Sequence, residues 1–171
     1  MLKSNNVSNV VVFWIRFENS RNKESLVSMK EVGIINRGMA KLVSEQGHGD
    51  TLMVVDAGFA IPKDIEVVDL SLRENAPIVI DVLAELKKYH SVEKMILAQQ
   101  TKTTNPTLFS NISNAWGDDM DLELIDHSEL KQMAKEVKAI IRTGDFTAYG
   151  NVILVSGAGD RWYCENKTAN N

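Results

Sequence analysis

Histidines and a few polar residues beside apolar runs are the side chains of this sequence best suited to chemistry. His48 and Asp56 flank one apolar run, His127 follows an alternating segment, and Tyr149-Gly150-Asn151 precedes another apolar run. An imidazole, with an ordinary pKa of about 6.5, both donates and accepts protons near neutral pH. Carboxylate, amide and phenol groups bind hydroxyls. The set allows acid–base chemistry, although each residue alone also has an ordinary structural role as a turn former, cap or loop residue.

Other chemistries are less well supported. His48, His90 and His127 are far apart and show no metal-binding spacing, so we expect no metal. Gly157-Ala158-Gly159 follows an apolar run, but no third glycine or helix-opening pattern comes after it, which argues against a dinucleotide fingerprint. Cys164 has no evident base beside it.

Composition narrows the function classes further. The chain has 171 residues, 44% of them apolar, and a net charge of −4, which disfavours a nucleic acid as partner. The single cysteine fits a reducing compartment. No stretch approaches the roughly 20 apolar residues that span a bilayer. We therefore expect a cytoplasmic protein that neither crosses a membrane nor binds nucleic acid.

The elements that must position the polar residues alternate along the chain. Short apolar runs predict strands, and amphipathic segments between them predict helices, the first capped by Asn36 and stopped by Gly47. Pro77 and Asn105-Pro106 mark two further helix starts, and Asp126 with Glu129 a fourth. The expected strands are 52–55, 65–70, 95–98, 121–125, 139–141 and 152–155. This alternation predicts a single α/β domain of three layers, α/β/α, with a largely parallel sheet.

Three regions follow from the pattern. Residues 1–28 read as a loose N-terminal extension or a mis-assigned start, residues 29–157 as the domain, and residues 158–171 as a tail. Within the domain, the polar residues lie where strands meet loops, which is where ligands of α/β sheets usually bind.

Several ordered motifs in the domain resemble the D-ribose pyranase family and its relatives, the L-fucose mutarotases. The resemblance covers about residues 29–157 in unbroken order. The motifs are Gly47-His48-Gly49-Asp50, Asp56-Ala57-Gly58 with Ile61-Pro62-Lys63, Val68-Asp69-Leu70-Ser71-Leu72, Ala139-Ile140-Ile141-Arg142-Thr143-Gly144 and Tyr149-Gly150-Asn151.

The resemblance implies an activity and a site. It implies that His48 is the catalytic proton donor, and that a monosaccharide of the ribose or fucose type contacts Asp56, His127 and the segment Tyr149, Gly150 and Asn151. Opening a sugar hemiacetal moves a proton to the ring oxygen while the anomeric hydroxyl loses one, which is work for an imidazole. We expect no cofactor.

The spacing of His48 and Asp56 raises a geometric problem. An extended chain would place them roughly 26 Å apart, at about 3.3 Å per residue, which one pentose cannot bridge. Either residues 47–50 fold back sharply, or His48 of one subunit faces Asp56 or Tyr149 of another. We favour a shared site in a homo-oligomer, because the resembled family forms ring-like assemblies.

Departures from the ribose pattern leave the substrate open. Gly49 and Ala148-Tyr149-Gly150-Asn151 are similar to the fucose branch, whereas Asp56-Ala57-Gly58 and Arg142-Thr143-Gly144 are similar to the ribose branch, and Gln99-Gln100 replaces a common pair of glutamates. The leading hypothesis is a D-ribose pyranase. The alternatives are a mutarotase for L-fucose or a related sugar, and a sugar-binding module without catalysis.

Overall fold

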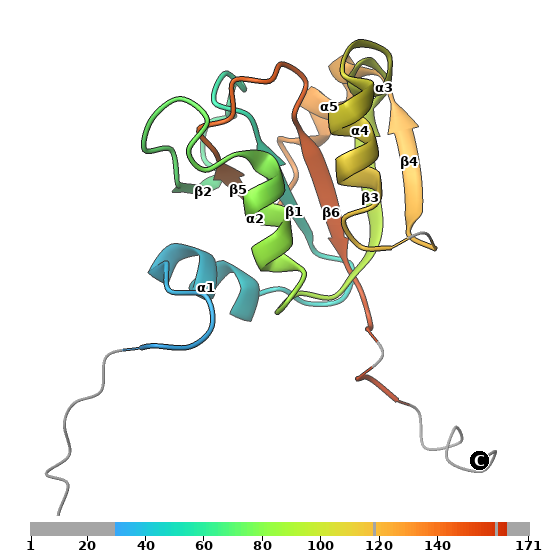
Figure 1. Ribbon diagram of the computed structural model, residues 1–171. Helices are drawn as coiled ribbons and strands as arrows, with labels where there is room; N and C mark the ends of the chain where they lie inside the picture. The colour runs from blue at the N-terminus through green and yellow to red at the C-terminus, as the bar shows by residue number, and fades with distance from the viewer. Residues whose placement is uncertain (1–29, 118, 160, 164–171) are drawn as a thin grey trace, which may run out of the picture. The chain divides into compact units, whose positions relative to one another are not determined.

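The apolar runs form one six-stranded sheet with strand order β2-β5-β1-β6-β3-β4 (Figure 1). The computed structural model describes residues 30–117, 119–159 and 161–163. The strands are β1 Thr51–Val55, β2 Glu66–Asp69, β3 Val92–Ala98, β4 Asp121–Ile125, β5 Ala139–Arg142 and β6 Val152–Ser156. The helices are α1 Arg37–Ser44, α2 Val79–Leu86, α3 Gln99–Thr104, α4 Pro106–Ser113 and α5 His127–Met133.

Strand β6 is the only strand of this sheet that runs against the others. It pairs antiparallel with β1 and β3, whereas the pairs β2·β5, β5·β1 and β3·β4 are parallel. Strands β1 to β5 therefore end at one edge, called here the carboxyl edge, and β6 begins there. At the opposite edge, called the amino edge, β1 to β5 begin and β6 ends. The expected single α/β domain with a largely parallel sheet is confirmed.

Alternation along the strands creates two cores. Leu52 and Val54 of β1 face the side covered by α1, α2 and α4, while Met53 and Val55 face the side covered by α5 (Figure 1). Leu83 of α2 is fully buried in the first core. The sheet thus lies between two helical layers, as the sequence pattern predicts.

Two helix ends differ from their expected form. Helix α1 ends at Ser44, before Gly47, because the Gln46 side chain donates its Nε2–H to the Leu42 carbonyl at 3.1 Å and so caps the last turn. Gly47 as a left-handed stop is wrong, since Gly49 has the positive φ of 83°. Helix α2 begins at Val79, two residues after Pro77. The N-caps at Asn36 and Asp126 are confirmed.

Helix α3 has no apolar stripe in the sequence Gln-Gln-Thr-Lys-Thr-Thr, and hydrophobic periodicity did not predict it. It continues directly from β3 at the carboxyl edge. Helix α4 begins at Pro106 as predicted, but the Asn105 side chain does not cap it. Its Nδ2–H instead donates to the Ala148 carbonyl at 2.6 Å.

The expected extension 1–28 lies outside the described residues, as does most of the tail 158–171. In the described part of the chain, no helix is long and apolar enough to cross a membrane. No three His, Cys, Asp or Glu side chains gather as a metal site there.

Candidate active site

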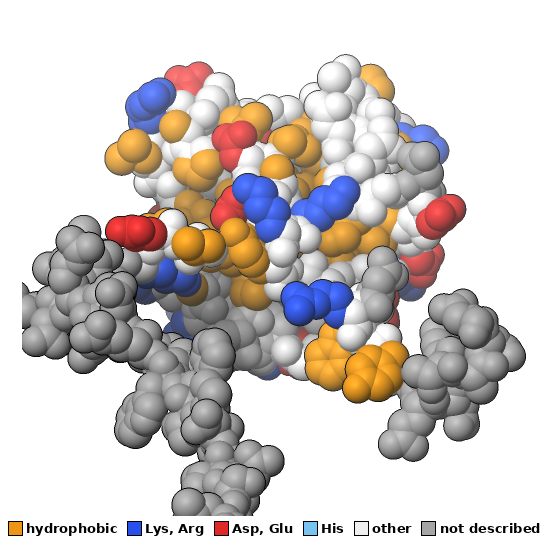
Figure 2. Space-filling model, turned by 60° about the horizontal axis from the view of Figure 1, so that its bottom comes forward, with side chains coloured by type: hydrophobic (Ala, Val, Ile, Leu, Met, Phe, Trp, Pro, Cys, Tyr) orange, Lys and Arg blue, Asp and Glu red, His pale blue; other side chains and the backbone are white. Residues whose placement is uncertain are grey.

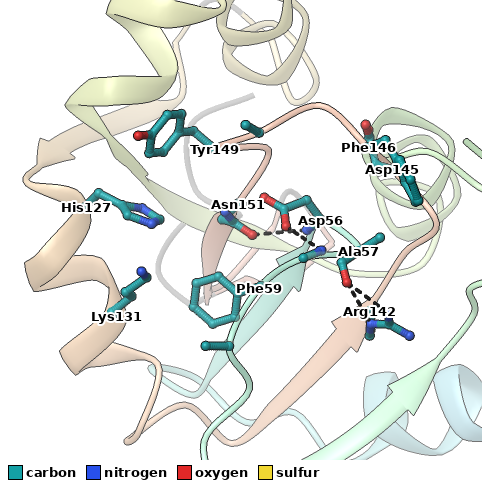
Figure 3. Close-up of a pocket in the computed structure, with 13 residues that line it drawn as sticks. Asp56, Ala57, Phe59, His127, Lys131, Arg142, Asp145, Phe146, Tyr149 and Asn151 are labelled. Carbon is teal, nitrogen blue, oxygen red and sulfur yellow. Dashed lines mark hydrogen bonds between the residues drawn. The ribbon is translucent and has the colours of Figure 1, made fainter. Parts of the chain in front are cut away.

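A pocket of about 470 Å³ opens at the carboxyl edge, between the ends of β1, β4 and β5 and the start of β6 (Figure 3). Four of the predicted site residues line it together: Asp56, His127, Tyr149 and Asn151. Asp56 follows β1, His127 opens α5 after β4, and the other two precede β6. The antiparallel β6 thus brings a loop from the far end of the sequence onto the edge where the parallel strands end.

Asp56 and Asn151 form a buried reciprocal pair. The Asp56 backbone N–H donates to Asn151 Oδ1 at 3.0 Å, and Asn151 Nδ2 donates to Asp56 Oδ2 at 2.8 Å. The two residues are 8% and 1% exposed. Gly58 N–H donates to the other carboxylate oxygen at 2.9 Å. A carboxylate has about four acceptor sites. Asp56 is therefore fixed in place while it keeps capacity to accept further hydrogen bonds.

Tyr149 stands edge-on to His127, with ring centroids 4.9 Å apart and an interplanar angle of 86°. Its backbone has a φ of 62°, which is unusual for a residue other than glycine. Thr101 Oγ1 donates to the Tyr149 carbonyl at 2.7 Å, and Asn105 donates to the neighbouring Ala148 carbonyl. The unpredicted α3 and the residue after it therefore hold this loop in a strained conformation beside the pocket.

Gly150 supports the loop but does not line the pocket. Its N–H donates to the Thr147 carbonyl at 3.2 Å, and a Cβ at this position would lie 3.0 Å from the same oxygen. Its predicted contact with a sugar stays a prediction, and the structure gives it a part in the turn that presents Tyr149 and Asn151.

His127 carries a buried Nδ1 without a hydrogen-bond partner in the described residues. Burial lowers the pKa of His127, the charge of Lys131 lowers it further, and Asp56 opposes them. Burial is the leading cause of the lowered pKa. His127 lines the pocket, and a neutral imidazole can donate a hydrogen bond through one nitrogen and accept one through the other.

Gln100 explains one departure from the ribose pattern. Its Nε2 donates to Asp126 Oδ2 at 2.8 Å, and its Oε1 accepts the His127 backbone N–H at 3.0 Å. Hydrogen bonds from Ser128 and Gln100 lower the pKa of Asp126 to about 2. A glutamate at position 100 would place a second negative charge against Asp126, so glutamine suits this environment.

His48 lies at the amino edge, away from the Asp56 pocket. Gly49 N–H donates to the Ser156 carbonyl at the C-terminal end of β6, and the His48 side chain is 70% exposed. Its Nε2 lies 3.6 Å from Glu93 Oε2. It lines a separate cavity of about 280 Å³. Within one chain, residues 47–50 do not fold back to the pocket, because all of β1 separates His48 from Asp56.

Three charged residues of the pocket were missed from the sequence: Lys131, Arg142 and Asp145. Lys131 lies one helical turn after His127, and this i, i+4 spacing could have predicted that both side chains lie on the same face of the helix. Arg142 donates through Nε and Nη2 to the Ala57 carbonyl and through Nη1 to Asp69 at 2.9 Å. It therefore ties the loop after β1 to β2.

Comparisons with known proteins agree with this architecture. Residues 29–159 match the model of the RbsD / FucU transport protein family. A D-ribose pyranase of Lactobacillus johnsonii is 43% identical over 129 residues, which are 75% of this chain and 98% of the relative. A D-ribose pyranase of Kosmotoga olearia is 44% identical over 130 residues, with the same two coverages.

Solved structures show the same fold. The structure of Bacillus subtilis RbsD complexed with D-ribose superposes with a TM-score of 0.73 at 37% identity, covering 77% of this chain and 99% of that chain. The fucose mutarotase from Streptococcus pneumoniae, in complex with L-fucose, gives a TM-score of 0.59 at 16% identity and covers 73% of this chain and 94% of that chain, which shows the fold alone. The chain belongs to the RbsD / FucU family, and the expected enzyme class, a sugar-ring isomerase, is confirmed by relatives named D-ribose pyranase.

Replacing Lys131 by methionine should raise the pKa of His127, because the substitution removes a positive charge that disfavours the imidazolium. The titration of the His127 Cε1 proton by NMR measures the change. Lys135→Met, which removes a charge from the same surface after α5, is the control and should leave the midpoint in place. Equal midpoints in wild type and Lys131→Met would contradict the assigned electrostatics.

Replacing Asn151 by aspartate should lower the free energy of unfolding at neutral pH by about 1–3 kcal/mol, because Asp56 loses a buried donor and gains a facing carboxylate. The carboxyl pair would then have a raised pKa, so the folded state binds the extra proton. The loss should shrink as pH falls through that raised pKa. Urea unfolding at neutral and mildly acidic pH measures it, with exposed Asn114→Asp as the control. A loss that does not depend on pH would refute the pairing.

Proposed function

We propose that this protein interconverts the pyranose and furanose forms of D-ribose without a cofactor, by acid–base opening and closing of the ring. In the reaction, the anomeric hydroxyl loses a proton and the ring oxygen gains one while the bond between C1 and that oxygen breaks. A different hydroxyl then adds to the resulting carbonyl. No electrons leave the sugar, so the proposed chemistry requires only proton donors and acceptors.

The pocket chemistry supports a sugar as the ligand. Asp56 offers acceptor capacity, Asn151 an amide, and His127 a neutral ring with an unpartnered nitrogen, all fixed by hydrogen bonds or packing before any ligand binds. Tyr149 adds an aromatic ring and a hydroxyl. Directional polar groups on a rigid frame match the several hydroxyls of one monosaccharide.

The observation that carries the proposal is this pocket in a chain whose curated relatives, at 43% and 44% identity, are named D-ribose pyranase. The sequence identity to the fucose mutarotase is 16%, and this similarity bears only on the fold. Ribose is therefore the proposed substrate, and L-fucose is the comparison sugar.

His48 is the proposed proton donor, and it acts on a sugar held by a second copy of the chain. Strand β1 alone spans roughly 16 Å at about 3.3 Å per residue, so one chain cannot bring His48 to the sugar bound at Asp56. A homo-oligomer in which the amino edge of one copy faces the pocket of the next would join the two halves.

Wild-type protein should accelerate pyranose–furanose exchange of D-ribose, and His48→Asn should lower the rate by about a hundredfold or more, because the asparagine amide cannot exchange protons near neutral pH. Magnetisation-transfer NMR measures exchange, with L-fucose in parallel, and calorimetry measures ribose binding. His48→Asn should still bind ribose, and Lys135→Ala is the control with wild-type rate.

If wild-type protein binds ribose but accelerates the exchange of neither sugar, the proposed enzymatic function is wrong and the protein is a sugar-binding module. Acceleration of L-fucose exchange alone would favour the mutarotase.

The shared site predicts complementation between two inactive variants. His48→Asn retains an intact Asp56 pocket, and Asp56→Asn retains an intact His48. When the two proteins are unfolded together in equal amounts and refolded, about a quarter of the sites should hold both native residues if the subunits mix at random. Exchange activity should recover to about that level. No recovery in oligomers shown by mass spectrometry to be mixed would contradict a site built from two copies.

A further inference from the structure

After β6, described residues at and beyond the end of the family match lie beside His48. The family match ends at residue 159, and the structure describes residues 161–163 beyond it. Because β6 is antiparallel to β1, it ends at the amino edge, where Ser156 exchanges backbone hydrogen bonds with Gly49 and Asp50. The residues that follow β6 therefore begin next to the His48 loop.

The Gly157-Ala158-Gly159 motif, which follows β6, packs closely against the start of β3. Gly157 N–H donates to the Ser91 carbonyl at 3.1 Å. A Cβ at Gly157 would overlap the Glu93 side chain, and one at Gly159 would lie 2.5 Å from Ser91 Oγ. Only glycine allows the backbone to pass this close to the start of β3. The motif thus has a packing role, and the Glu93 side chain that it packs against has its Oε2 3.6 Å from His48 Nε2.

Trp162 lies at the cavity that His48 lines. Trp162 N–H donates to the Gly159 carbonyl at 2.9 Å, and the Trp162 side chain lines the same cavity of about 280 Å³ as His48. The residue is 73% exposed. In Figure 2, which brings the bottom of Figure 1 forward, hydrophobic side chains protrude at this edge. A large aromatic ring thus stands open beside the proposed proton donor.

We propose that Trp162 is a wall of the sugar site on the His48 side, where its ring covers the C–H face of the bound sugar. This inference rests on the proposed function. To protonate the ring oxygen, His48 must approach the sugar held by the neighbouring copy, which brings that sugar to the cavity that Trp162 bounds. An indole offers an apolar face to C–H groups and an N–H to a hydroxyl, so it suits a monosaccharide.

Trp162→Ala should raise the KM for D-ribose in the exchange assay about threefold to tenfold, the scale of one aromatic contact, with kcat nearly unchanged. Tyr163→Ala is the matched control, because Tyr163 is adjacent, 80% exposed and does not line the cavity. Sedimentation of both variants reports assembly. An unchanged KM would overturn the proposal. So would a Trp162→Ala variant that loses its assembly while its remaining oligomers keep the wild-type KM, because Trp162 would then serve only the subunit interface.

Tryptophan fluorescence provides a readout that does not need turnover. Ribose should change the emission of wild type and of Trp116→Phe, and the change should be absent in Trp162→Phe. If wild type shows this pattern but no exchange of any sugar, the proposed function fails and the contact between Trp162 and the sugar stands. If wild type exchanges ribose and Trp162→Phe keeps the full emission change, only this inference fails. No ribose-dependent emission change in wild type overturns it as well.

Discussion

The reversal of β6 within an otherwise parallel sheet is the constraint on which the site depends. Its first residues join the pocket at the carboxyl edge, where Asn151 pairs with Asp56, and its last residue joins the His48 loop at the amino edge. One strand therefore connects the proposed sugar-binding half of the site to the proposed catalytic half and holds them apart. A second copy of the chain is the simplest way to bring the two halves onto one sugar.

The pocket is rigid because its polar groups form hydrogen bonds with one another. The Asp56 carboxylate and the Asn151 amide fix each other in a buried setting, where an unpaired partner would be costly. Thr101 and Asn105 hold the strained loop at Tyr149 from the side of α3 and α4. Preorganisation of this kind lowers the ordering cost of binding a small polar ligand.

The sequence predicted the fold well where patterns are local. Apolar runs located the strands, and caps such as Asn36 and Asp126 located helix starts. Helix α3 was missed because it lacks an apolar stripe and depends on its place after β3. The end of α1 was misplaced because the capping group is the Gln46 side chain, and periodicity does not report side-chain caps.

Four pocket residues were predicted together, since each adjoins a strand end, but Arg142 and Asp145 act through long-range bonds that spacing does not reveal. The spacing of His48 and Asp56 left two alternatives open, a fold-back of residues 47–50 or a site shared between subunits, and β1 excludes the fold-back within one chain.

Exchange activity measured against oligomeric state decides whether the catalytic site needs two copies of the chain. Sedimentation and magnetisation-transfer NMR on D-ribose would be run on the same samples across a dilution series. Activity per chain should stay constant while the oligomer persists and should fall as folded monomers replace it. A folded monomer with the full exchange rate would contradict it.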